Sequence, residues 1–150
     1  EYTATDRDPN TAYHSSFCNL VFKKENGPMS DLFDITLPIL LSAVDKQNLQ
    51  LKDLFRIRIG LVTRTPEPIV HPAHKDYHTP HKTGLYYLNQ ADGDTIIYNE
   101  TKESDKYSVK ESIEPKLNRW YNFDGAHYHS STTPTQTEKR IVITFNYETN

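Results

Sequence analysis

Apolar and polar positions follow a helical spacing in one part of the chain. From Leu37 to Leu49 the apolar residues recur every three or four positions, which places them on one face of an α-helix. Thr36 suits the N-cap, and Pro38 falls in the first turn, where a proline is tolerated. The pattern predicts a single amphipathic helix over residues 37–49.

Beyond this helix the spacing of apolar residues changes to two. Ile57 and Ile59 alternate with Arg56 and Arg58, as in a strand that has one apolar and one polar face. Shorter segments with strand signals follow, separated by turn signals such as Asp92-Gly93. Strands are expected at residues 17–22, 55–64, 69–77, 84–88, 95–98, 107–113, 119–123, 127–130 and 139–147.

Many short strands and one helix define the expected fold class. Strands and helices do not alternate along the chain, which favours a sandwich or jelly roll over a parallel sheet. The 150 residues suffice for one domain with a substantial core. We expect a mainly β protein in which residues of about 1–50 form a supporting strand and helix, and residues of about 55–147 form a jelly-roll core.

Charge and composition narrow the classes of function. The net charge is −3, with both signs interspersed, so no clear nucleic-acid surface is expected. No apolar run approaches the ~18–20 residues of a membrane span. A single cysteine, Cys18, excludes an internal disulfide and suits a reducing compartment. We therefore expect a cytoplasmic protein. The first residue, Glu1, indicates that the sequence begins inside a longer product.

Histidines and one aspartate gather in residues 70–89, which hold four of the seven histidines. A soluble protein seldom places so many imidazoles beside a carboxylate unless they bind something. The candidate ligands, with two histidines further along the chain, are His71, His74, Asp76, His78, His81, His127 and His129.

Spacing pairs two of these residues, and a third could complete a metal site with them. His74 and Asp76 lie two positions apart in a predicted strand, so their side chains are expected on the same face. With His129, they offer the two imidazoles and one carboxylate of the facial triad of non-haem iron(II) oxygenases. On the residues alone, other interpretations stay open. His78 and His81 have a spacing that could serve a zinc site, and a surface cluster could bind no metal.

Several motifs, in a fixed order, resemble the Fe(II)/2-oxoglutarate-dependent oxygenase superfamily. They are H-K-D at 74–76, H-K-T-G-L-Y-Y-L-N at 81–89, A-D-G-D-T at 91–95, N-R-W-Y-N-F-D-G at 118–125, Y-H-S-S-T-T-P at 128–134 and R-I-V-I-T-F-N-Y at 140–147. The branch that they resemble most is the small prolyl-4-hydroxylase-like proteins of bacteria and phages. The resemblance covers about Arg56 to Tyr147, whereas residues 1–50 carry little of it.

The resemblance implies a fold and a role for individual residues. The fold would be a double-stranded β-helix, or jelly roll, with a flanking N-terminal α-helix. His74, Asp76 and His129 match the iron ligands, whereas Arg140 and Tyr87 match residues that bind the far carboxylate of 2-oxoglutarate. A guanidinium suits that carboxylate because its planar fork bonds both oxygens.

Strand alternation sharpens the choice among neighbouring residues. Lys139 would lie on the face opposite to Arg140, so only one of them can point into the barrel. Arg58, on the polar face of its strand, could also line the co-substrate pocket. His127 lies on the same face as His129, but Tyr128-His129-Ser130 fits the family pattern better.

The resemblance also implies an activity: a hydroxylase that uses Fe(II), 2-oxoglutarate and dioxygen, with ascorbate as a candidate reductant. Asp76 favours hydroxylation over halogenation, because a halide needs the position that the carboxylate fills. The expected substrate is a prolyl or other peptidyl residue, or a small molecule, in a bacterial or phage-infected cell. Two alternatives remain. One is a non-catalytic jelly-roll binding or phage structural module, and the other is a cupin-type metal enzyme without a co-substrate, against which Arg140 argues.

Overall fold

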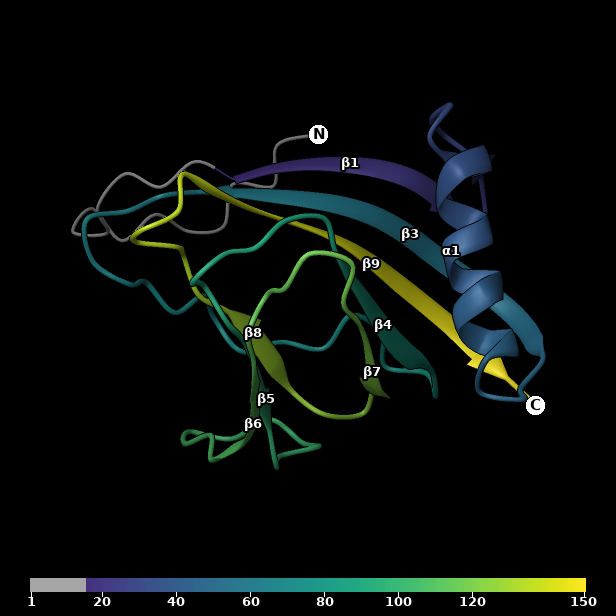
Figure 1. Cartoon of the computed structure of the whole chain (residues 1–150). Helices are drawn as coiled ribbons and strands as arrows, with labels where there is room; N and C mark the ends of the chain where they lie inside the picture. Colours follow the sequence, from purple (N-terminus) through teal and green to yellow (C-terminus); the bar gives the residue numbers. More distant parts are fainter. Residues whose placement is uncertain (1–15) are drawn as a thin grey trace.

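The computed structural model describes residues 16–150, so any part that residues 1–15 play in the expected N-terminal support lies outside the described residues. Figure 1 shows strands stacked in two layers, with a helix beside the long strands of one layer. The elements are β1 (Ser16–Lys23), β2 (Gly27–Pro28), α1 (Phe33–Asp45), β3 (Leu51–Thr63), β4 (Lys82–Tyr87), β5 (Thr95–Tyr98), β6 (Val109–Ile113), β7 (Trp120–Asp124), β8 (His129–Ser131) and β9 (Lys139–Thr149).

Two antiparallel sheets form the molecule. The larger sheet has the order β2-β1-β3-β9-β4-β7 and the smaller sheet the order β6-β5-β8. Single bridges from Val70 to Thr132 and from His74 to His129 attach the segment before β4 to the smaller sheet, beside β8. The chain is thus mainly β, a double-stranded β-helix with a flanking helix, which confirms the expected fold class.

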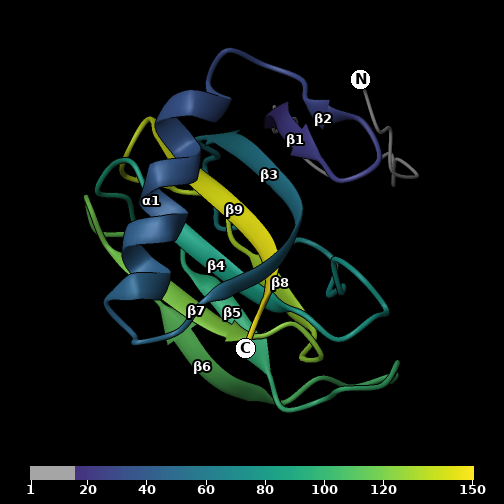
Figure 2. The same ribbon diagram turned by 90° about the vertical axis from the view of Figure 1, so that its right-hand side faces the viewer.

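Helix α1 covers the outer face of the larger sheet, as Figure 2 shows. Leu40 and Val44 of the helix are buried against Ile57, Ile143 and Phe145 of the strands below. Every second residue of β9 points toward this layer because side chains alternate along a strand. The helix and the sheet therefore share one apolar core on the side away from the smaller sheet.

A second core lies between the two sheets. Its buried residues come from both of them: Leu85, Tyr87, Ile97, Ile113, Phe123 and Val142. The inner face of the larger sheet also carries polar side chains, because Arg140, Thr144 and Asn146 alternate with the outward residues of β9 and are buried. Apolar residues therefore surround a buried polar region between the sheets.

The helix begins and ends earlier than expected. It starts at Phe33, whose ring stacks on Phe22 with centroids 5.3 Å apart, so tertiary packing extends the helix beyond the predicted start. Thr36 is not the N-cap: it lies inside the helix, and its hydroxyl donates to the carbonyl of Leu32 at 2.8 Å. Asn48 adopts a φ of 54°, a left-handed conformation that cannot continue a helix.

The expected strand at 69–77 is wrong as a continuous element. Only Val70 and His74 pair with the smaller sheet, and both bridges are isolated. Pro72 lies between them and has no N–H to donate, so a regular ladder cannot pass through this position. The other expected strands are present, although β3 is longer than expected and β6 and β8 begin two residues later. Within residues 16–150, no helix has the length and apolar character that spanning a bilayer requires.

Candidate metal centre and co-substrate pocket

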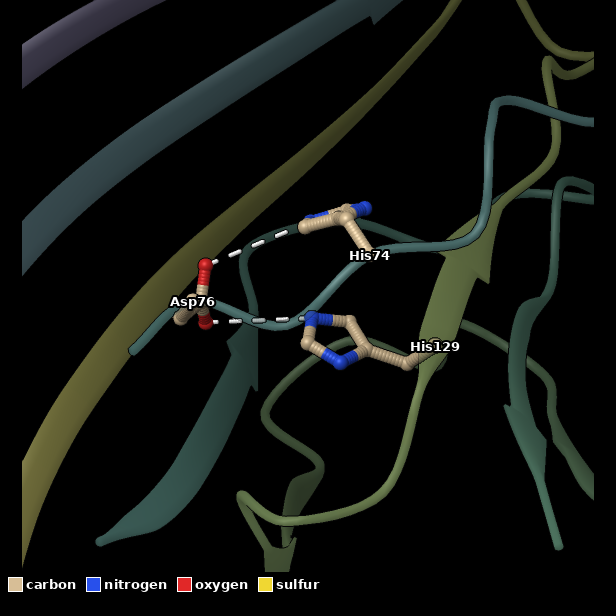
Figure 3. A group of neighbouring side chains, drawn as sticks. All are labelled: His74, Asp76 and His129. Carbon is tan, nitrogen blue, oxygen red and sulfur yellow. Dashed lines mark ion pairs between the residues drawn. The ribbon is translucent and has the colours of Figure 1, made fainter. Parts of the chain in front are cut away.

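Three side chains converge between the sheets, as Figure 3 shows. The ligand atoms of His74, Asp76 and His129 all lie within 4.8 Å of one another, a separation at which they could hold one metal ion. Nε2 of His74 is 4.0 Å from Oδ1 of Asp76, and Nε2 of His129 is 3.7 Å from Oδ2. The two histidines thus approach opposite oxygens of one carboxylate. The three ligands converge although residues 69–77 do not form the expected continuous strand.

Backbone pairing sets the two histidines side by side. The N–H of His74 donates to the carbonyl of His129 at 3.0 Å, and the N–H of His129 donates back at 2.9 Å. In each ring, Nδ1 faces the carbonyl two residues earlier, Pro72 for His74 at 3.1 Å and His127 for His129 at 3.4 Å. A ring nitrogen that donates to a carbonyl carries the proton, so Nε2 keeps its lone pair for a metal.

Asp76 is held from the other side by β3 and β9. Its side chain is 2% exposed. Arg56 donates to Oδ1, whereas Nδ2 of Asn146 donates to Oδ2 at 2.8 Å. Nε of Arg56 also donates to Oδ1 of Asn146 at 3.0 Å, and Nδ2 of Asn146 lies 3.2 Å from the Thr83 hydroxyl. This network fixes the carboxylate plane before any ligand arrives.

Electrostatics favour the metal-binding protonation state of the triad. Burial alone would raise the pKa of Asp76, but Arg56, His129 and the Asn146 amide hold it well below its usual range. Burial lowers the pKa of His129 to about 4, against the opposing attraction of Asp76. An ionised carboxylate and a neutral imidazole are the forms that bind a divalent cation, so the site is preorganised near neutral pH.

A second polar cluster surrounds Arg140. The side chain of Arg140 is 3% exposed, whereas its neighbour Lys139 is exposed, as alternation predicted. Nη2 of Arg140 donates to the Thr95 hydroxyl at 2.6 Å, and the same hydroxyl lies 2.8 Å from the Tyr87 hydroxyl. The guanidinium also stacks over the Tyr87 ring, 5.5 Å from its centroid. Arg140 and Tyr87 therefore meet in one polar cluster.

The charge of Arg140 is not balanced within this cluster. Its Nε is buried without an acceptor, and among residues 16–150 no carboxylate forms an ion pair with it. Burial lowers the pKa of Arg140 and raises the pKa of Tyr87. A phenol that keeps its proton can donate to an anion. Together these groups suit a carboxylate.

Arg58 lies on the inner face of β3, where its Cα pairs with that of Thr144. It lies two residues after Arg56, hence on the same face. Its Nε is buried without an acceptor. Burial has the largest effect on the pKa of Asp76 and on that of His129. The positive charge of Arg58 has a smaller effect, and it lowers both pKa values. Arg58 therefore lies close enough to Asp76 and His129 to act on their charges, and its contact with the co-substrate stays a prediction.

The other histidines of residues 16–150 do not join the three converging ligands. Nδ1 of His71 lies 2.8 Å from the Ser131 hydroxyl, and Nε2 of His127 lies 2.9 Å from Nζ of Lys110. His78 is exposed. His81, which could have served a zinc site with His78, is only 6% exposed and lies outside the group of three ligands.

Sequence reasoning missed three residues that contact the predicted ones. Arg56 and Asn146 hold Asp76, and Thr95 joins Arg140 to Tyr87. The sequence held a signal for two of these residues. Arg56 shares a strand face with Arg58, and Thr95 ends the A-D-G-D-T motif. Asn146 shares the face of Arg140 on β9, but nothing in the sequence alone pairs it with Asp76.

Comparisons with known proteins bear on the fold. No protein-family model and no curated protein matches the sequence. Solved structures do match. A prolyl hydroxylase from Trichoplax adhaerens, in complex with a hypoxia inducible factor peptide fragment, is 18% identical with a TM-score of 0.54. The match covers 88% of this chain and 62% of the hydroxylase.

Two bacterial structures match as well. An oxidoreductase of the 2OG-Fe(II) oxygenase family from Burkholderia pseudomallei is 13% identical, with a TM-score of 0.60 and coverage of 89% of this chain and 68% of that one. A prolyl-4-hydroxylase from Pseudomonas putida is 12% identical, with a TM-score of 0.51 and coverage of 90% and 70%. The chain has the fold of these oxygenases. It spans less than two thirds of the Trichoplax protein.

Proposed function

We propose that this chain is an Fe(II)- and 2-oxoglutarate-dependent dioxygenase that hydroxylates its substrate. One observation carries the proposal: a His-Asp-His triad lies in the same barrel as a buried arginine, Arg140, with which no carboxylate of residues 16–150 forms an ion pair. The first feature suits a metal and the second suits an anion. A non-catalytic jelly-roll module would need neither.

His74, Asp76 and His129 are the proposed metal ligands. Two imidazoles and one carboxylate on one side of an ion leave open positions for exchangeable ligands, the arrangement that suits non-haem Fe(II). Proton-bearing Nδ1 atoms and an ionised, buried Asp76 give each residue the lone pair that coordination requires. The donor set therefore fits iron.

Arg140, with Tyr87 and Thr95, is proposed to hold the far carboxylate of 2-oxoglutarate. The register of the smaller sheet supports the placement, because Thr95 lies opposite Ser131 and Ile97 lies opposite His129. Two residues of strand span about 7 Å, which is of the order of the length of a five-carbon dicarboxylate. One carboxylate can thus meet the guanidinium while the other end reaches the triad.

The chain would contribute position, charge and exclusion of water. Arg56 and Asn146 keep the Asp76 carboxylate oriented, so a ligand meets a site that does not need to rearrange. The apolar side chains between the sheets remove water around the co-substrate. Bound Fe(II) with 2-oxoglutarate and dioxygen would supply the oxidising power, with release of succinate and carbon dioxide.

The substrate proposed by analogy is a prolyl or other peptidyl residue. The Trichoplax prolyl hydroxylase is complexed with a peptide fragment, and analogy of fold alone supports the extension to this chain. Ascorbate is proposed as an auxiliary reductant, and the cytoplasm as the location.

The test is optical and chemical. Anaerobic Fe(II) plus 2-oxoglutarate should produce a weak visible charge-transfer band that is lost in His74→Ala and Asp76→Ala. Under air, the wild type should release succinate from 2-oxoglutarate when a peptide panel is added. A folded wild-type protein that shows neither the band nor succinate would refute the proposal.

A further inference from the structure

Among residues 16–150, the guanidinium of Arg58 near the triad forms no ion pair with a carboxylate, and its buried Nε has no hydrogen-bond acceptor. The nearby carboxylate of Asp76 is already bonded by Arg56 and Asn146. Arg58 is therefore a positive group with unfilled hydrogen-bonding capacity next to the proposed metal.

The charged residues on the inner face of the larger sheet leave an excess of positive charge near Arg58. Arg56, Arg58 and Arg140 are positive, whereas two carboxylates oppose them: Asp76, buried beside Arg56, and the half-buried Asp94, which acts on Arg140. A divalent ion adds two positive charges, and 2-oxoglutarate brings two negative ones. The site then still holds an excess of positive charge. Since uncompensated charge between packed sheets is costly, a further anion fits here.

Position separates Arg58 from the co-substrate pocket. Arg58 pairs with Thr144, whereas Val62 pairs with Arg140. Four residues of strand correspond to about 13 Å, so the two arginines project from different parts of the same face. Arg140 suits the far carboxylate of 2-oxoglutarate, whereas Arg58 would lie beside a metal ion held by the triad.

We propose that Arg58 binds a carboxylate of the primary substrate beside the metal. The substrate is then a free amino acid, a chain end or a residue that lies next to an acidic group, and not a neutral internal residue. The inference rests on the proposed function and deepens it. The carboxylate that Arg58 binds could instead belong to 2-oxoglutarate, at the end that would bind the metal. The experiment distinguishes the substrate from the co-substrate.

The experiment uses the full chain with Zn(II) in place of iron and saturating 2-oxoglutarate, so no turnover is needed. The Nε–H resonances of the arginines are followed by ¹⁵N-correlated NMR, and the Arg58 peak is assigned by its absence in Arg58→Gln. Acetate and N-acetyl-L-proline supply a carboxylate, whereas acetamide and N-acetyl-L-prolinamide are their neutral counterparts. The matched control is Arg64→Gln, an exposed arginine at the end of the same strand segment.

The carboxylate probes should shift the Arg58 peak saturably, whereas the amides should not. Their dissociation constants should rise about tenfold or more in Arg58→Gln, because a charge-assisted pair is lost, and should stay unchanged in Arg64→Gln. An Arg58 peak that responds to 2-oxoglutarate itself and then to no probe would assign the residue to the co-substrate and overturn the inference. Equal responses to acids and amides, or no response, would also overturn it. Failure of the proposed function looks different, since the Arg140 peak would then ignore 2-oxoglutarate.

Discussion

Replacing Arg140 by methionine should stabilise the protein without ligand and abolish its response to 2-oxoglutarate. Arg140 is almost fully buried, and its only hydrogen-bond acceptor in the described part of the chain is the Thr95 hydroxyl. An unsatisfied buried polar group costs about 1–3 kcal/mol, and replacing buried charge by an apolar side chain of similar length is often stabilising. Methionine has that length and removes the cost.

The expected size follows from these figures. We expect the free energy of unfolding of the ligand-free protein to rise by about 1–2 kcal/mol, partly offset by imperfect packing of methionine. For a chain of this size that corresponds to a rise in Tm of roughly 2–8 °C. Loss of a buried charge-assisted carboxylate contact should cost about 2–4 kcal/mol of binding, so Kd for 2-oxoglutarate should rise roughly 30- to 1000-fold.

The assay is thermal unfolding with and without 2-oxoglutarate in the presence of Zn(II). Wild type should gain stability with ligand concentration, because the ligand binds only the folded state, whereas Arg140→Met should show no gain. Arg140→Lys keeps the charge but loses the fork, so its response should be intermediate. Lys139→Met, at the exposed neighbour, is the control and should behave like wild type. An Arg140→Met protein that unfolds earlier than wild type without ligand, or that still binds 2-oxoglutarate, would refute the reasoning.

Two further predictions concern stability away from the site. The Asp92 carboxylate accepts hydrogen bonds from three consecutive backbone N–H groups, Thr135 to Thr137, at 2.8–3.0 Å. Burial raises the pKa of Asp92, but these hydrogen bonds together outweigh it and hold the pKa well below the usual range. Asp92→Asn should cost about 1–2 kcal/mol near neutral pH after allowance for its exposure. Because the folded pKa is depressed, this stability is present above about pH 4 and lost as pH falls below it. Denaturant melts should therefore converge for variant and wild type at low pH, and a constant gap at every pH would contradict the argument. Gly84→Ala would place a Cβ 2.5 Å from the Trp120 ring and should lower the free energy of unfolding by about 1–3 kcal/mol. Gly60→Ala, whose Cβ meets nothing nearer than 4.0 Å, is the control and should be close to neutral. Similar melts for the two variants would show that the Trp120 ring moves aside without cost.

Period-two patterns predicted the strands well because burial acts directly on them. On β9 the alternation separated exposed Lys139 from buried Arg140, and on β4 it separated Tyr87 from Tyr86, which packs against the outer core. On both strands a one-residue slip would exchange the residues of the two faces, for example buried Arg140 for exposed Lys139, so it would be costly. The sequence signal was strong for that reason.

Elements set by tertiary contacts were harder to predict. The start of α1 depends on the packing of Phe33 on Phe22, which no local propensity contains. The segment at 69–77 has the composition of a strand, but Pro72 restricts it to two isolated bridges. Local pattern therefore misjudged both the beginning of the helix and the length of this strand.

The candidate site was predictable only in part for a similar reason. His74, Asp76, His129 and Arg140 belong to motifs, and the structure brings the first three together. Arg56 and Asn146 are distant in sequence from each other and meet at Asp76 because β3 and β9 pair in register. Such contacts depend on which strands become neighbours, and the pattern of one strand does not carry that information.

The reciprocal backbone bonds between His74 and His129 have a consequence for how the protein folds. These residues come from segments far apart in the chain, and the side chains of residues 16–150 that donate to Asp76 belong to strands of the opposite sheet. The three ligands can therefore come together only after both sheets have closed on each other. A metal bound there would favour the closed barrel over every partly assembled form, so its binding free energy would add to the stability of the whole fold. Metal binding and folding of the barrel would then be thermodynamically coupled.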